Sequence, residues 1–157
     1  MISEVRAVEV REDRRETLFN LMQKYLYEMT RYYPIAMGED GNYDYDYLPL
    51  YFSERARQAY FFYVGETLVG FALINDYSFT GEPTDNSIAE FTIFPAYRGR
   101  GYAGSAVEAL RALRPGSWQL KYSPKNAAGA GLWQKIKRRY DGVEQPLPDG
   151  HVAISFS

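Results

Sequence analysis

IAEFTIFPAYRGRGYAG, residues 88–104, is the segment that decides the fold of this chain. It begins as an apolar strand, turns at Pro95, and enters a helical pattern at Gly101 or Tyr102 after a short run of Arg and Gly. Main-chain N–H groups are unpaired at the start of a helix, and the helix dipole adds partial positive charge there. The turn therefore resembles an anion site, for which phosphate or pyrophosphate is the natural guest.

The residues of this turn leave two interpretations open. Arg98 and Arg100 would add charge and forked donors, and the small residues Gly101 and Ala103 would let a phosphate approach the main chain. A plain strand-to-helix turn with solvated arginines fits the same spacing. The turn is not a P-loop, because no Lys-Ser or Lys-Thr follows the glycine, and it lacks the third glycine of a dinucleotide turn.

Composition restricts the class of protein. The 157 residues predict one domain, residues 1–157, and 46% apolar residues allow a proper core. A net charge of -2 argues against a nucleic-acid partner, and the absence of cysteine excludes disulfides and thiolate chemistry. His151 is the only histidine, which argues against a metal site or a His-based triad. We find neither a signal pattern nor an apolar run of about 18 residues, and therefore expect a cytoplasmic protein with no membrane contact.

Hydropathy patterns predict an α/β or α+β fold with a mixed sheet. Strands are expected at 5–10, 59–64, 68–75, 87–94, 117–122 and 151–156, and helices at 13–32, 48–57, 102–113 and 126–140. The strand at 87–94 is apolar on both faces, so we expect it at the centre of the sheet. The last strand, VAISF, could pair between subunits and form a homodimer.

Glu90 lies within the central strand. On an extended strand its side chain shares a face with Ile88 and Thr92. A carboxylate there is costly unless it is paired or functional, and burial would raise its pKa toward neutrality, where it can accept a proton from an amine. A paired structural glutamate, or one at a water-filled sheet edge, fits the pattern as well.

Two further segments carry polar groups that could meet a ligand. Asn126 precedes a helix pattern, where it can cap the helix or hold the polar arm of a ligand. The aromatic and acidic segment at 43–47 could attract a cationic ligand, with Tyr33 completing the pocket, or it could simply cover the core. The basic run KIKRR at 135–139 is interpreted as a solvated helix end, with contact to a ligand phosphate or RNA as the less favoured alternative.

In this order, the strand, Arg/Gly turn, helix and Asn-led helix resemble the GNAT superfamily of N-acetyltransferases. Residues 88–104 look like that family's central strand and pyrophosphate turn, normally Q/R-x-x-G-x-G/A. Asn126, Gly129 and Trp133 look like its second signature. The resemblance spans nearly the whole chain and implies a splayed mixed sheet of about six or seven strands with about four flanking helices.

The resemblance also implies a co-substrate, acetyl-CoA, and no metal. The main chain of Phe91, Thr92 and Ile93 would bind the pantetheine arm, which Asn126 would touch and beside which Trp133 would lie. The diphosphate would be held by a run of residues in the turn, led by Arg98: Gly99, Arg100, Gly101, Tyr102, Ala103 and Gly104.

The implied reaction moves an acetyl group to a primary amine of a small molecule or peptide, with Glu90 as general base and a backbone N–H as oxyanion donor. Trp133 stands where many members carry a tyrosine acid, so Tyr122, Tyr102 or Tyr140 would have to protonate the thiolate. The acceptor-binding residues would be Tyr33, Tyr45 and Asp46, and the acidic loop 39–46 suggests a cationic acceptor. A catalytically silent acyl-CoA-binding module is the alternative.

Overall fold

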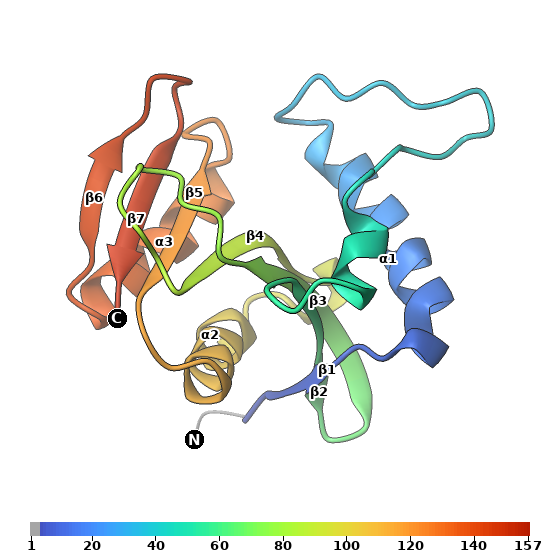
Figure 1. Cartoon of the computed structure of the whole chain (residues 1–157), viewed down its shortest axis with the longest axis horizontal. Coiled ribbons are helices and arrows are strands. Elements are labelled where there is room, and N and C mark those ends of the chain that lie inside the picture. The colour runs from blue at the N-terminus through green and yellow to red at the C-terminus, as the bar shows by residue number, and fades with distance from the viewer. Residues whose placement is uncertain (1–3) are drawn as a thin grey trace.

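The computed structural model describes residues 4–157, so the first three residues of the predicted 1–157 domain lie outside it. Within this part the chain forms one seven-stranded sheet and three α-helices (Figure 1). The strands are β1 (Arg6–Glu9), β2 (Gln58–Val64), β3 (Thr67–Asn75), β4 (Asn86–Ile93), β5 (Trp118–Tyr122), β6 (Val143–Pro146) and β7 (Val152–Phe156). The helices are α1 (Arg15–Met29), α2 (Tyr102–Leu113) and α3 (Ala127–Arg139).

The sheet opens between its fourth and fifth strands. The strand order is β1-β2-β3-β4-β5-β7-β6, and all neighbours are antiparallel except β4 and β5. These two parallel strands pair only from Asn86 to Ile88 of β4, opposite Trp118 to Leu120 of β5. The rest of β4 continues without β5 beside it, and Figure 1 shows β5, β7 and β6 turning away from β1–β4. The two halves of the sheet therefore diverge around the second half of β4.

The helices cover both faces of β4, as expected for a central strand. On one face the buried side chains of α1, Leu18, Met22 and Leu26, form a core with β2, β3 and the 3₁₀ turn Leu48–Phe52. On the other face α2 and α3 bury a second core against the sheet. Apolar residues at three- and four-residue steps produce these stripes because the α-helix repeats every 3.6 residues.

A β-bulge in β4 changes which residues share a face. Leu73 of β3 lies opposite Glu90, whereas Ile74 lies opposite Ile88, so Ala89 is the extra residue. An extra residue reverses the alternation of side chains. Ile88 therefore packs into the core under α2 and α3, and Glu90 faces α1. The prediction that Ile88 and Glu90 share a face is wrong for this reason.

The helix count also differs from the expected four. Residues 48–57 form a 3₁₀ turn over Leu48–Phe52 rather than a helix. The segment is short and carries Pro49, and its last amides at Ser53 and Glu54 both return to the carbonyl of Leu50. Three α-helices are therefore present among residues 4–157.

The C-terminal strands correct the expectation that VAISF offers an edge for pairing between subunits. The segment Val143–Pro146 was not predicted as a strand, because its sequence VEQP has no apolar alternation, yet it forms the edge strand β6. β7 then lies between β5 and β6, and its main chain is paired along both sides. The apolar strand VAISF is consequently internal, and it has no free edge for a second subunit.

Candidate active site

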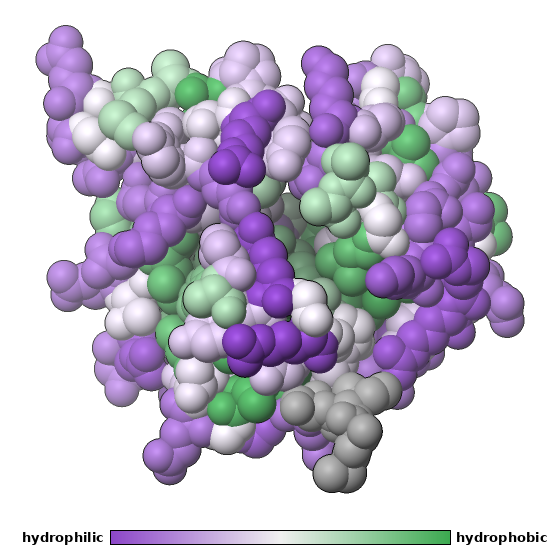
Figure 2. Space-filling view, turned by 180° about the vertical axis from the view of Figure 1, so that it is seen from behind, coloured by the Kyte–Doolittle hydropathy of each residue, from purple (hydrophilic) through white to green (hydrophobic). Residues whose placement is uncertain are grey.

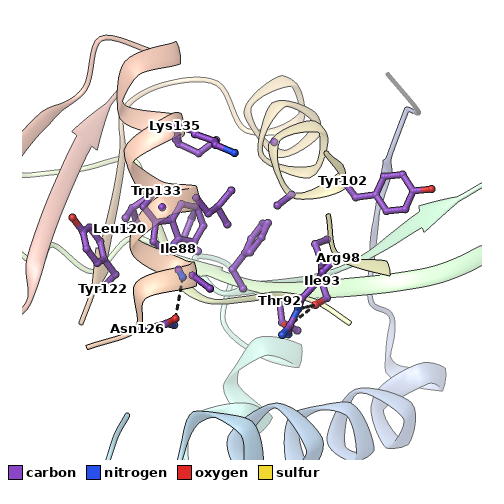
Figure 3. Close-up of a pocket in the computed structure, with 18 of the residues that line it drawn as sticks. Ile88, Thr92, Ile93, Arg98, Tyr102, Leu120, Tyr122, Asn126, Trp133 and Lys135 are labelled. Carbon is purple, nitrogen blue, oxygen red and sulfur yellow. Dashed lines mark hydrogen bonds between the residues drawn. The ribbon is translucent and has the colours of Figure 1, made fainter. Parts of the chain in front are cut away.

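A cavity of about 1180 Å³ lies where β4 and β5 separate. It extends from α1 along β4 to the turn before α2 and the facing side of α3. Figure 3 shows the part between α2 and α3, and Figure 2 shows the molecule from behind, with a hollow near the centre of that face. The cavity exists because the second half of β4 has no partner strand on this side.

The turn before α2 offers a series of main-chain donors to this cavity. Gly99 and Gly101 have φ angles of 80° and 79°, a left-handed conformation that other residues rarely adopt. Gly101 is the N-cap of α2 and supplies no side-chain acceptor. No hydrogen bond within residues 4–157 uses the amides from Gly99 through Gly104, and all these residues line the cavity. Free amides at a helix start, together with the helix dipole, suit an anion.

The exposed edge of β4 offers a second set of main-chain hydrogen-bonding groups to the cavity. Phe94 donates its amide to the Val69 carbonyl at 2.8 Å, which makes this a hydrogen-bonded pair of the antiparallel ladder. Such pairs alternate along the ladder, so the main chain of Thr92 faces β3 while that of Phe91 and Ile93 faces the cavity side. Of the three residues predicted to bind an extended ligand through their main chain, two are placed to do so.

Arg98 braces the turn rather than extending from it. Its Nη1 and Nη2 donate to the two carboxylate oxygens of Glu28 on α1, at 2.6 and 2.7 Å, and its Nε donates to the Ile93 carbonyl at 2.6 Å (Figure 3). These bonds also lower the pKa of Glu28. Arg100, the other arginine of the turn, is exposed and lines the cavity.

The basic end of α3 also lines the cavity, a position that the sequence interpretation had treated as the less favoured alternative. Lys135 extends from α3 toward α2 (Figure 3), and Arg139 lies next to Gly104, where an added Cβ would be 3.5 Å from its Nη1. Arg139 also donates to Glu108 of α2 at 2.8 Å. The helical period that places these two cations on one face, four residues apart, was the available signal.

Glu90 lies at the α1 end of the same cavity and accepts hydrogen bonds from two tyrosines. Tyr25 of α1 donates its hydroxyl to Oε1 at 3.0 Å, and Tyr45 of the loop before β2 donates to Oε2 at 2.9 Å. Burial raises the pKa of Glu90 to about 7, while the two hydroxyls and the nearby charge of Lys121 act in the opposite direction. A carboxyl group with this pKa exchanges protons near neutral pH.

The sequence matches the family model for the acetyltransferase (GNAT) family over residues 16–135. The chain belongs to the GNAT acetyltransferase family. No curated protein sequence matches it significantly.

Solved structures show the same GNAT fold. A GNAT family acetyltransferase from Streptococcus agalactiae has 14% identity and a TM-score of 0.73, covering 99% of this chain and 96% of that chain. The aminoglycoside acetyltransferase AAC(6')-Ib in complex with coenzyme A and kanamycin has 16% identity and a TM-score of 0.71, with 98% and 95% covered. The ribosomal-protein-alanine N-acetyltransferase from Brucella melitensis biovar Abortus 2308 has 20% identity and a TM-score of 0.59, with 85% and 90% covered.

The second signature of this GNAT chain forms the start of α3. Asn126 is the N-cap, and its Oδ1 accepts from the Gly129 amide at 2.9 Å, as the capping prediction requires. A Cβ on Gly129 would lie 2.7 Å from Asn126 Nδ2, so a larger residue there would require the capping side chain to shift. Trp133 is buried and meets Phe91 edge to face, with 5.2 Å between ring centroids (Figure 3).

The three tyrosines considered as replacements for the usual GNAT acid differ in position. Tyr122 lines the cavity, and its hydroxyl accepts from Gln134 Nε2 at 2.8 Å, which leaves its own proton available. Tyr102 also lines the cavity, but its ring points away from Trp133 (Figure 3). Tyr140 packs against Phe156 and does not line the cavity.

The expected acceptor-binding residues separate into two groups. Tyr33 lines the cavity and stacks on His151, with ring centroids 5.6 Å apart and planes 6° from parallel. Tyr45 reaches the site through its bond to Glu90. Asp46 is exposed and does not line the cavity.

Two other kinds of feature are absent from residues 4–157. No group of three or more His, Cys, Asp or Glu side chains could hold a metal ion. None of the helices has both the length and the apolar content needed to cross a bilayer.

Proposed function

We propose that this protein transfers the acetyl group of acetyl-CoA to a primary amine of a small molecule or peptide. The observation that carries the proposal is that one cavity contains both the run of free amides from Gly99 to Gly104 and the Glu90 carboxyl group. The first suits a diphosphate, and the second suits a proton transfer at neutral pH. Solved structures of the same fold contain coenzyme A, acetyl-CoA and aminoglycosides, which supports both halves of the proposal.

The cofactor would lie along elements that the structure leaves unpaired. The turn amides would bind the diphosphate, with Arg100, Lys135 and Arg139 supplying positive charge around it. The main chain of Phe91 and Ile93 would bind the pantetheine arm as an added strand. Bound in this way, acetyl-CoA supplies an activated acyl group with a thiolate leaving group.

The residues of the chain would then act on the amine. Glu90 accepts a proton from the ammonium form, which frees the nitrogen lone pair to attack the thioester carbonyl. A main-chain N–H of β4, at Phe91 or Ile93, stabilises the developing oxyanion. As the amide forms, the nitrogen loses its second proton to solvent and the C–S bond breaks. Tyr122, which lines the cavity, is the candidate to return a proton to the thiolate. A thiol pKa of about 8.5 means that this step needs little help.

A catalytically silent acyl-CoA-binding module is the second candidate, favoured by one observation. Trp133 occupies the position of the usual tyrosine acid and is packed into the core, where its indole cannot act as a proton donor to a thiolate. Such a module would bind CoA without transferring the acetyl group.

Two measurements distinguish these candidates. Calorimetric titration with CoA tests the cofactor site, which both candidates require. Release of free CoA from acetyl-CoA in the presence of a panel of primary amines tests transfer. Amine-dependent release supports the enzyme, and tight CoA binding with no release for any amine supports the silent module.

A further inference from the structure

The acceptor end of the cavity, the part around Glu90 and away from the turn, has a distinct chemical lining. Its side chains come from α1 and the residues that follow it, and from β4 and β5. Besides Glu90 and Glu28 they include Tyr25, Met29, Arg31, Tyr32, Tyr33 and Lys121. Three of these side chains are tyrosines and one is a methionine, and the other two, Arg31 and Lys121, are cations.

The acidic residues expected to attract a cationic acceptor do not face this end. Glu39, Asp40, Asp44 and Asp46 of the 39–46 loop are all exposed, and none of them lines the cavity. The loop reaches the site through the hydroxyl of Tyr45 instead. The negative charge of this segment is therefore directed to solvent.

The other carboxylates near the acceptor end are paired with cations. Glu28 is held in the two-pronged contact with Arg98. Asp149 contacts Lys121 Nζ at 3.3 Å and His151 Nδ1 at 3.1 Å, and it does not line the cavity. Among the described residues that line this end, Glu90 is consequently the one carboxyl group without a cationic partner.

Positive charge occupies the same end. Lys121 and Arg31 both line this end of the cavity. The charge of Lys121 lowers the pKa of Glu90, although the contact with Asp149 offsets part of that charge. One ammonium group can be neutralised by Glu90. A second ammonium on the same acceptor would share the cavity with Lys121 and Arg31, and like charges within one cavity repel.

Resting on the proposed function, we propose that the acceptor carries a single amine and no second cationic group, on an apolar or aromatic body. The tyrosine rings and Met29 contact the body, Glu90 receives the amine, and Lys121 disfavours polyamines and aminoglycosides. This proposal replaces the strongly cationic acceptor that the charge of the 39–46 loop had suggested.

A matched pair of substrates tests this proposal. Hexylamine and 1,6-diaminohexane have the same chain and differ only by a second amine. We expect kcat/KM to be about tenfold higher for hexylamine at near-neutral pH, because the second ammonium meets like charge. Two equivalent amines give the diamine a statistical advantage of about twofold, so a preference for hexylamine is a conservative result. 2-Phenylethylamine should be used at least as well as hexylamine.

The variant Lys121→Gln tests whether Lys121 causes the preference for hexylamine over the diamine. Lys125→Gln is the control. Lys125 is exposed on the same segment and does not line the cavity. We expect the preference for hexylamine to fall at least about threefold in Lys121→Gln, where Asp149 also loses its partner, and to stay unchanged in Lys125→Gln. Equal or better use of 1,6-diaminohexane, spermidine or kanamycin by the unaltered protein would overturn the proposal, as would an equal preference in both variants.

Failure of the proposed function has a different signature. If the protein neither binds CoA nor releases it from acetyl-CoA with any amine, both the enzyme assignment and the acceptor class are overturned. If it acetylates the diamine preferentially, only the acceptor class is overturned.

Discussion

Replacing Tyr45 by Phe tests how the protein sets the proton affinity of Glu90. The Tyr45 hydroxyl donates to Glu90 Oε2 at 2.9 Å and stabilises the ionised carboxylate. Its removal should therefore raise the pKa of Glu90 above the present value of about 7. A hydrogen bond to a charged group contributes about 1.5–3 kcal/mol, and water would replace part of it, so we expect a rise of about one pKa unit.

The effect on activity follows from the protonation state that a base requires. Glu90 must be ionised to accept a proton, so kcat/KM falls as the pH drops below its pKa. A shift from about 7 to about 8 lowers the ionised fraction about tenfold at pH 6 and by less than about a tenth at pH 9. The acidic limb of the profile should move to higher pH while the alkaline plateau is kept. Tyr25→Phe should shift it in the same direction, because the Tyr25 hydroxyl donates to Oε1.

The assay is kcat/KM, from CoA release, between about pH 5.5 and pH 9.5. Tyr60→Phe is the matched control, because the Tyr60 hydroxyl donates to Gln58 at 2.6 Å and the ring belongs to the core under α2 and α3. Its profile should match that of the unaltered protein. A Tyr45→Phe profile that is unchanged, or that moves to lower pH, would refute this account of Glu90.

Three further predictions concern other parts of the site. Glu90→Gln should lower kcat/KM at least about tenfold and remove the acidic limb of the pH profile; a variant with the original profile would exclude Glu90 as the base. Gly101→Val should weaken CoA binding in calorimetry at least about tenfold, because φ at this position is 79° and valine does not adopt it; tight binding by the folded variant would contradict the turn assignment. Asn126→Ala removes the cap bond to Gly129 and should lower the free energy of unfolding by about 1 kcal/mol, or Tm by about 2–4 °C; an unchanged Tm would show that the cap contributes nothing.

Local patterns predicted most of the regular structure. The helix at 102–113 has the bounds expected from its apolar period, and the cap at Asn126 and the central position of β4 agree with the structure. The helix and its cap depend on residues within a few positions of one another, where sequence spacing fixes geometry. The central position of β4 was predicted from its apolar residues on both faces. β6 was missed because an exposed edge strand needs no apolar alternation.

The candidate site depended on contacts that spacing does not contain. Tyr25 lies 65 residues before Glu90 in the chain. Nothing in the helical pattern of α1 marks Tyr25 as a hydrogen-bond partner of Glu90 rather than as an ordinary core tyrosine. Arg98 looked free because its partner, Glu28, is 70 residues away. The acids of the 39–46 loop looked suited to a ligand until the fold placed them in solvent.

The sequence by itself determined the turn, because glycines at 99 and 101 and the start of a helix leave amides free whatever surrounds them. It also determined the family, since both signatures are short and local. Only the tertiary structure decided what Glu90 can do. The bulge at Ala89 turns it toward α1, and the separation of β4 from β5 opens the cavity beside it. Both depend on how strands far apart in the chain pair, and that pairing is set by packing over the whole sheet rather than by any one segment.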